Sequence, residues 1–221
     1  MGYNDDNSIK RIIRGDCMLE EQLHKALTYI DDKWQMQNND YDSKSNFIYS
    51  VNTVDECIEL SKQNNIDIKY ALHRWYNFKT SIQCENIFVE YGAVKENNVK
   101  HKEIDLYINS IPFDVKLTVY PKALCNHPYD LSTRSGKNKM IEWMYKHQSQ
   151  QGRKHLKNRL FMVCDGTSQY NNLCLKSDFE QIRNKIHKFI EYTGKNGFNE
   201  LCITDNNEQY IVKSDIILIK G

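Results

Sequence analysis

The sequence has little proline, almost no net charge and no long apolar run. Only three of its 221 residues are proline and the formal net charge is +1, so neither a Pro-rich linker nor a polyanion-binding chain is indicated. No stretch approaches the roughly 18 apolar residues of a membrane span. The first residues lack the basic start and apolar run of a signal peptide. These absences lead us to expect a soluble cytoplasmic protein.

Cysteine is present, but without a pattern that would pair it. The chain has seven cysteines, an odd number, and no two are spaced as C-x-x-C. A disulfide framework and a zinc knuckle are therefore not expected. Most of these residues should be buried, reduced thiols in a reducing compartment.

Positive charge is concentrated in one segment despite the near-neutral total. Residues 121–160 carry nine Lys or Arg and only two acids. A local basic stretch of this kind is what contact with a nucleic acid needs, and a solvated charged helix is the alternative explanation. The candidate nucleic-acid contacts within this segment are Arg134, Lys137, Lys139, Arg153 and Lys154.

Hydrophobic periodicity and capping signals predict alternating helices and strands. The predicted helices are 17–36, 53–63, 68–86, 138–156 and 177–192, and the predicted strands are 87–95, 103–108, 111–119, 159–164 and 210–219. Helices followed by β-β-β and then α, β, α, β indicate an α/β protein with a central mixed sheet. We expect residues 1–66 to form an N-terminal helical extension and residues 67–221 to form the core.

One predicted hairpin concentrates charge on a single face. Its strands are joined by Asn109-Ser110, an acceptable pair for a tight turn. This turn places Asp105 opposite Asp114, and opposed side chains of an antiparallel pair share a face. Lys116 shares that face because strand side chains alternate, while the residues between them are apolar. One face should therefore belong to the core, and the other should carry two carboxylates and an ammonium group.

Two opposed carboxylates repel each other unless a cation lies between them. A hard divalent cation with oxygen ligands offsets that repulsion. Lys116 beside such a cation would help to orient and deprotonate a water molecule whose pKa the metal lowers. This chemistry suits in-line hydrolysis of a phosphodiester. The alternative is an ordinary half-exposed strand face on which Glu103, Asp114 and Lys116 form salt bridges.

The order of these elements resembles the PD-(D/E)XK, or restriction-endonuclease-like, nucleases. That family has an acid on a first helix, an Asp on a strand and Asp/Glu-x-Lys on the next strand, followed by a helix and a strand. This chain offers Glu85, Asp105 and Asp114-Val115-Lys116 in that order. The resemblance covers about residues 68–165 and implies a restriction-endonuclease-like core.

The resemblance also implies roles for particular residues. Asp105, Asp114 and the Val115 carbonyl would bind Mg²⁺, with Mn²⁺ as a substitute, and Lys116 would act on the attacking water. The chain departs from the family in having Ile104 where Pro is common. The gap between the two acids is also short, which requires a tight hairpin.

Two positions of the implied site have more than one candidate. The helical acid is Glu85 or Glu90, and the helix position favours Glu85. A Gln that some family members place on the second helix would be Gln148 or Gln151.

The function expected from the resemblance is that of a Mg²⁺-dependent DNA endonuclease. The chain length suits a small type II restriction enzyme, which implies a homodimer that cuts both strands. A repair, phage or mobile-element nuclease of the same fold is an alternative, and so is a nucleic-acid-binding module without turnover. The sequence leaves open DNA against RNA and the recognition site.

Overall fold

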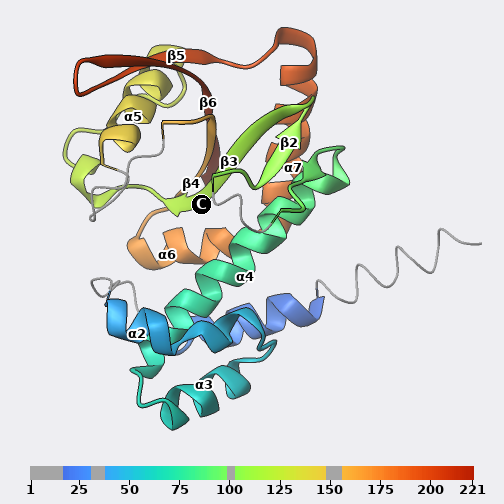
Figure 1. Ribbon diagram of the computed structural model, residues 1–221, viewed down its shortest axis with the longest axis vertical. Coiled ribbons are helices and arrows are strands. Elements are labelled where there is room, and N and C mark those ends of the chain that lie inside the picture. Colours follow the sequence, from blue (N-terminus) through green and yellow to red (C-terminus); the bar gives the residue numbers. More distant parts are fainter. Residues whose placement is uncertain (1–16, 31–37, 99–102, 148–155) are drawn as a thin grey trace, which may run out of the picture. The chain divides into compact units, whose positions relative to one another are not determined.

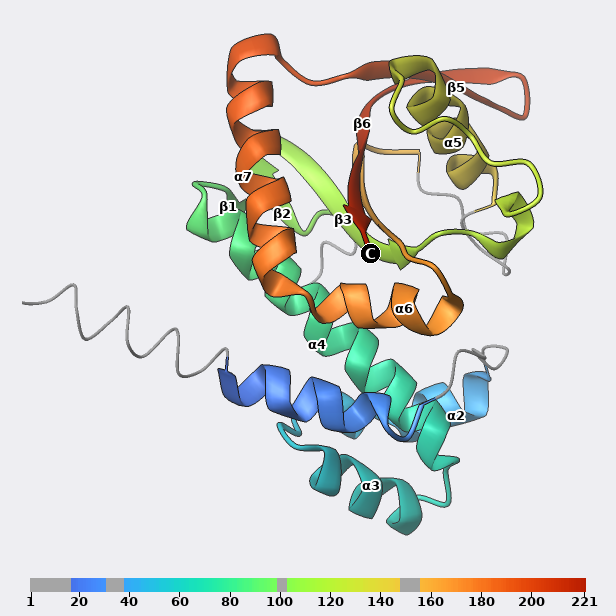
Figure 2. The same ribbon diagram turned by 180° about the vertical axis from the view of Figure 1, so that it is seen from behind.

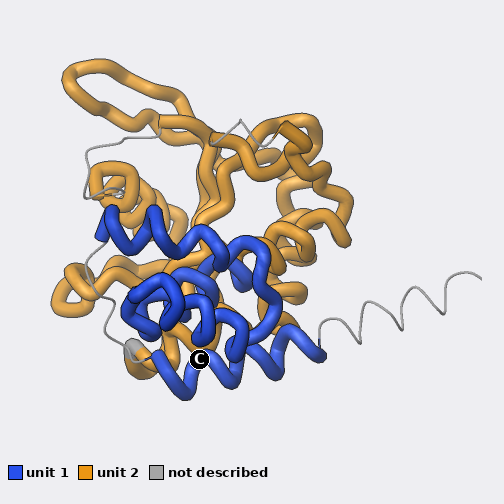
Figure 3. The backbone as a smooth tube through the Cα atoms, turned by 60° about the horizontal axis from the view of Figure 1, so that its bottom comes forward, with its two compact units in different colours: residues 1–80 blue, residues 81–221 orange. Residues whose placement is uncertain are grey.

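The computed structural model describes residues 17–30, 38–98, 103–147 and 156–221 of the chain. It divides into two compact units, residues 1–80 and residues 81–221 (Figure 3). The boundary expected after residue 66 lies just before helix α4, whereas the units divide within that helix.

The first unit is helical. Its helical segments are residues 17–27, α2 Asn39–Lys44, η1 Asn46–Tyr49, α3 Val54–Gln63 and the first part of α4 Ile68–Glu90. Helix α3 begins with a capping box, in which the Thr53 side chain accepts the Glu56 N–H and the Glu56 side chain accepts the Thr53 N–H. The core of this unit includes Trp75, whose indole N–H donates to the Val51 carbonyl at 3.1 Å.

The second unit contains a six-stranded mixed sheet with the strand order β1-β2-β3-β4-β6-β5. Its strands are β1 Val94–Lys95, β2 Leu106–Ile108, β3 Ile111–Val119, β4 Arg159–Asp165, β5 Glu200–Asp205 and β6 Glu208–Lys220. The pairs β3–β4 and β4–β6 are parallel, and the other neighbouring pairs are antiparallel. The predicted α/β architecture with a central mixed sheet is therefore confirmed.

Helices cover both faces of this sheet. Helix α5 Arg134–Lys146 lies against one face and packs on Phe161, Val163 and Ile216. Helix α7 Phe179–Asn196 lies on the opposite face, and the short helix α6 Gln169–Cys174 precedes it (Figures 1 and 2). Within the described parts of the chain, no helix has the length and apolar character needed to cross a membrane.

The hairpin between β2 and β3 has the predicted turn and register. Asn109 and Ser110 both have positive φ, 50° and 64°, as the twist-matched type I′ turn requires. Leu106 pairs with Phe113, which is the register that places Asp105 next to Asp114. The structure thus confirms the predicted turn and the register of Leu106–Ile108, and Asp105 directly precedes these paired residues.

The strand predicted over residues 87–95 is wrong for most of its length. Helix α4 continues to Glu90, and the chain turns at Gly92, which has a φ of 93°, before β1 begins. Cys84 and Ile87 are fully buried one helical turn apart, so this short apolar run follows helical spacing. A run of this length does not distinguish a strand from a buried helix.

Other elements also differ from prediction. The helix predicted over 17–36 ends at residue 27, and the strand predicted over 103–108 begins at Leu106. The helix predicted over 138–156 begins earlier, at Arg134, because Thr133 caps it by accepting the Gly136 N–H at 3.0 Å. The helix ends at Lys146, whereas the prediction extended it to residue 156, which is not helical; residues 148–155 lie outside the described residues. Strand β5 was not predicted, since Glu200–Asp205 offers only two buried apolar positions among polar residues.

The edge of β6 that faces away from β4 pairs with β5 over residues 208–213, and side chains bond to it beyond that pairing, within residues 214–220. Lys137 donates from Nζ to the Ile216 carbonyl at 2.9 Å. Gln181 of α7 accepts the Lys220 N–H and donates to the Lys220 carbonyl, both at 2.8 Å. These side chains replace a neighbouring strand and reduce the number of unpaired backbone groups along the edge.

Candidate active site

The hairpin brings the carboxyl groups of Asp105 and Asp114 together. Asp105 directly precedes β2, and its N–H donates to the Phe113 carbonyl at 2.9 Å. Its carboxylate accepts the Val115 N–H at 2.7 Å. Burial raises the pKa of Asp105 most strongly, and the neighbouring Asp114 raises it further, against the lowering effect of the Val115 N–H. Two acidic groups thus share one partly buried position.

Asp114 is more enclosed than the sequence indicated. Asp114 is 3% exposed, although it lies on the strand face that was expected to be open to solvent. One oxygen, Oδ1, lies 2.7 Å from Nζ of Lys116, and the other, Oδ2, contacts Nε of Arg159. The Lys116 side chain is 51% exposed, so this ammonium joins the buried acid to the surface.

Arg159 is a residue of the site that the sequence analysis missed. It begins β4 and pairs in register with Asp114 across the parallel β3–β4 ladder. Its side chain is 5% exposed, and its guanidinium carbon lies 6.0 Å and 5.9 Å from the ring centroids of Tyr145 and Phe161. An Arg at the start of an otherwise apolar strand was the available signal, because a buried cation needs a buried acid.

Glu85 lies beside the carboxyl pair, on the part of α4 that belongs to the second unit. It is 9% exposed, and burial is the main cause of its raised pKa. Asp105 raises that pKa further, whereas Lys95 and Lys116 lower it. The Lys95 ammonium lies 3.0 Å from Glu85 Oε2 and is a second cation that the sequence analysis did not identify.

Glu90 has a different partner. Its carboxylate pairs with Nε of Arg183 on α7 at 3.2 Å. Of the two candidate helical acids, Glu85 is therefore the one whose charge acts on Asp105 and Lys116.

Two of the predicted nucleic-acid contacts form ion pairs within the fold, and others lie outside the described residues. Arg134 pairs with Asp215 Oδ2 at 2.7 Å, and Lys137 lies 3.8 Å from Asp215 Oδ1, so both side chains join α5 to β6. Lys139 is exposed. The remaining candidates lie outside the described residues: Gln148, Gln151, Arg153 and Lys154.

The oxygen donors at the hairpin fit a hard divalent cation held partly by water. Besides the carboxylates of Asp105 and Asp114, the Val115 carbonyl points to the same side of β3 as the Val115 N–H. Mg²⁺ commonly takes one or two protein carboxylates and completes its octahedron with water. In the described part of the chain, no three or more His, Cys, Asp or Glu residues are grouped so as to hold a metal ion. The oxygen donors available at the hairpin are therefore two carboxylates and one backbone carbonyl.

Comparisons with known proteins add no further identification. No protein-family model, curated protein or solved structure matches the chain. The functional proposal therefore depends on the geometry around the β2–β3 hairpin.

Proposed function

We propose that the protein is a Mg²⁺-dependent endonuclease that hydrolyses phosphodiester bonds of DNA. The observation that carries the proposal is the adjacency of Asp105 and Asp114, with the Lys116 ammonium 2.7 Å from Asp114. The order of α4, the β2–β3 hairpin, α5 and β4 supports a restriction-endonuclease-like core.

Each residue of the site has a separate proposed role. Asp105, Asp114 and the Val115 carbonyl would hold the divalent cation, which supplies a water of lowered pKa and offsets charge on the phosphate. Asp114 anchors Lys116 on one side, and the exposed part of Lys116 offers N–H donors to the attacking water or to a phosphate oxygen. Glu85 adds negative charge beside Asp105 and would hold a water bound to the cation.

The biological role proposed is that of a restriction or defence nuclease acting as a cytoplasmic homodimer. A repair, phage or mobile-element nuclease of the same fold is the alternative within the class. All seven cysteines are free, which agrees with a reducing compartment.

A second candidate is a nucleic-acid-binding module without turnover. Both oxygens of Asp114 already face cations, Lys116 and Arg159. A closed ion-pair network of this kind would also suit a site that holds its shape without a metal.

Incubation with supercoiled plasmid separates the two candidates. We expect nicking or linearisation that needs Mg²⁺ or Mn²⁺ and stops with EDTA, while a matched RNA substrate tests DNA against RNA. A panel of plasmids of differing sequence guards against a missing recognition site. Binding to DNA without cleavage on the whole panel would favour the binding module.

A further inference from the structure

Arg159 is buried between two aromatic rings, beside Asp114. The rings of Tyr145 and Phe161 flank its guanidinium at 6.0 Å and 5.9 Å. The Tyr145 hydroxyl donates to the Lys157 carbonyl at 2.7 Å, so this ring is itself held in place. Arg159 therefore has little freedom to leave Asp114.

The backbone around Arg159 is equally constrained. Asn158, the residue before it, donates to the Pro112 carbonyl at 3.0 Å and accepts the Lys213 N–H at 2.8 Å. The Arg159 carbonyl accepts a hydrogen bond from the Ser214 hydroxyl at 2.7 Å. These contacts join the start of β4 to β3 and β6, and they fix the origin of the Arg159 side chain.

The partners of Asp114 differ in exposure. Arg159 is 5% exposed and takes Oδ2, whereas Lys116 is 51% exposed and takes Oδ1. A buried planar guanidinium fixes a carboxylate in one orientation, which a flexible ammonium does not do. Oδ2 of Asp114 is thus held by the buried guanidinium of Arg159, and Oδ1 lies beside the exposed ammonium of Lys116.

We propose that Arg159 is the positioning residue of the metal site. It holds Asp114 Oδ2, and thereby presents Oδ1 to the cation and to Lys116 in a single orientation. Arg159 itself does not touch substrate. This inference deepens the proposed function and rests on it. It identifies the start of β4 as the support for the acid carried by β3.

The test compares Mn²⁺ binding, followed by the electron paramagnetic resonance signal of free Mn²⁺, with thermal midpoints measured in parallel. Arg159→Lys keeps the charge but loses the planar group, and we expect it to bind Mn²⁺ about tenfold more weakly, as supporting contacts of metal ligands do. Proton relaxation of the bound ion should then report about one additional water. Arg183→Lys, at the ion pair with Glu90, is the matched control and should bind like the wild type.

The charge-removing variant Arg159→Met separates positioning from simple repulsion of the metal. Tighter Mn²⁺ binding by this variant, or binding by folded Arg159→Lys within about twofold of the wild type, would overturn the inference. If Arg159→Lys does not fold, Phe161→Leu removes one flanking ring and should weaken binding in the same direction; unchanged binding again overturns it. A wild-type protein that neither binds Mn²⁺ nor cleaves DNA contradicts the proposed function itself.

Discussion

At the scale of single residues, Glu85 and Glu90 lie on the same helix, about 1.4 turns apart, and have different electrostatic partners. Glu85 acts on Asp105 and Lys116, while Glu90 pairs with Arg183. We expect Glu85→Gln to lower the rate of DNA cleavage by about ten- to a hundredfold, because it removes a charge from the site. Glu90→Gln should remain within about twofold of the wild type. Equal losses in the two variants would contradict this assignment, and single-turnover cleavage measures both.

Lys176 gives a pH-dependent prediction that is independent of catalysis. It is 5% exposed, and burial lowers its pKa to about 8, from 10.5. Because the unfolded state binds the additional proton between these values, this group makes stability rise as pH increases from about 8 to 10.5. Below pH 8 both states are protonated, and the cost of burying the charge is fully present.

Lys176→Met removes this titrating group, so the stability of the variant relative to the wild type should fall by about 1–3 kcal/mol as the pH rises from 7 to 10. Urea denaturation of both proteins at pH 7 and at pH 9.5 measures the two differences. A difference that stays constant between the two pH values, or that moves in favour of the variant at pH 9.5, would contradict a lowered pKa for Lys176.

Sequence reasoning identified some residues of the site and missed others for a physical reason. Asp105, Asp114 and Lys116 come together through a local hairpin, whose turn and register can be read from neighbouring residues. Arg159 and Lys95 reach the site through strand pairings beyond that hairpin. Their partners depend on which strands become neighbours in the sheet, and a single sequence does not state that order.

At the scale of elements, the β2–β3 turn supplies a stability prediction. Ser110 has a φ of 64°, a left-handed conformation that glycine adopts at lower cost. Ser110→Gly would create the favoured Asn-Gly pair and should stabilise the protein by about 0.5–1 kcal/mol. Thr118→Gly, in the extended backbone of β3, should instead destabilise it.

Thermal denaturation of the two glycine variants checks both directions. A lower midpoint for Ser110→Gly would mean that the serine side chain makes a contact more valuable than the relief of its backbone. Glycine favours the same turn, so Ser110→Gly should keep the register of β2 and β3 and leave Asp105 next to Asp114.

Element prediction failed where local pattern and tertiary packing disagree. The apolar run after Cys84 suits a strand by composition, yet it continues α4 because its buried positions follow a helical repeat. Strand β5 carries little apolar signal of its own and exists because β6 pairs with it. The parallel strand β4, by contrast, was predictable as a short buried run closed by Asp165-Gly166.

At the scale of the whole molecule, every described residue of the candidate site belongs to the second unit. Glu85, the β2–β3 hairpin and Arg159 all lie between residues 81 and 221. The first unit has its own packed core, which contains Trp75 and Tyr70. The proposed chemistry therefore belongs to the sheet-containing unit, and substitutions on the exposed surface of the helical unit should leave it unaffected.

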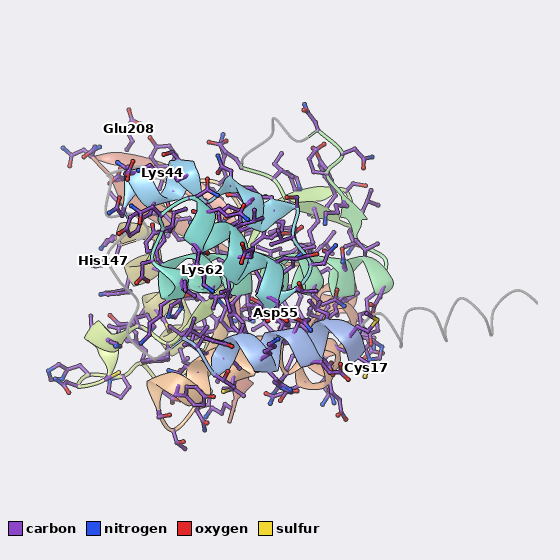
Figure 4. The ribbon with its side chains drawn as sticks, turned by 90° about the horizontal axis from the view of Figure 1, so that it is seen from below. Cys17, Lys44, Asp55, Lys62, His147 and Glu208 are labelled. Atoms are coloured by element: carbon purple, nitrogen blue, oxygen red, sulfur yellow. The ribbon has the colours of Figure 1, made fainter. Side chains whose placement is uncertain are left out.

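The most direct test of the central claim compares single-turnover cleavage of DNA by Lys116→Ala and Lys62→Ala with that of the wild type in Mg²⁺. Lys62 is an exposed lysine on α3, in the first unit, and controls for the loss of one surface charge (Figure 4). We expect at least about a hundredfold loss for Lys116→Ala. For Lys62→Ala we expect a change within about twofold. Metal-dependent cleavage that survives Lys116→Ala at the wild-type rate would contradict the assignment of the site.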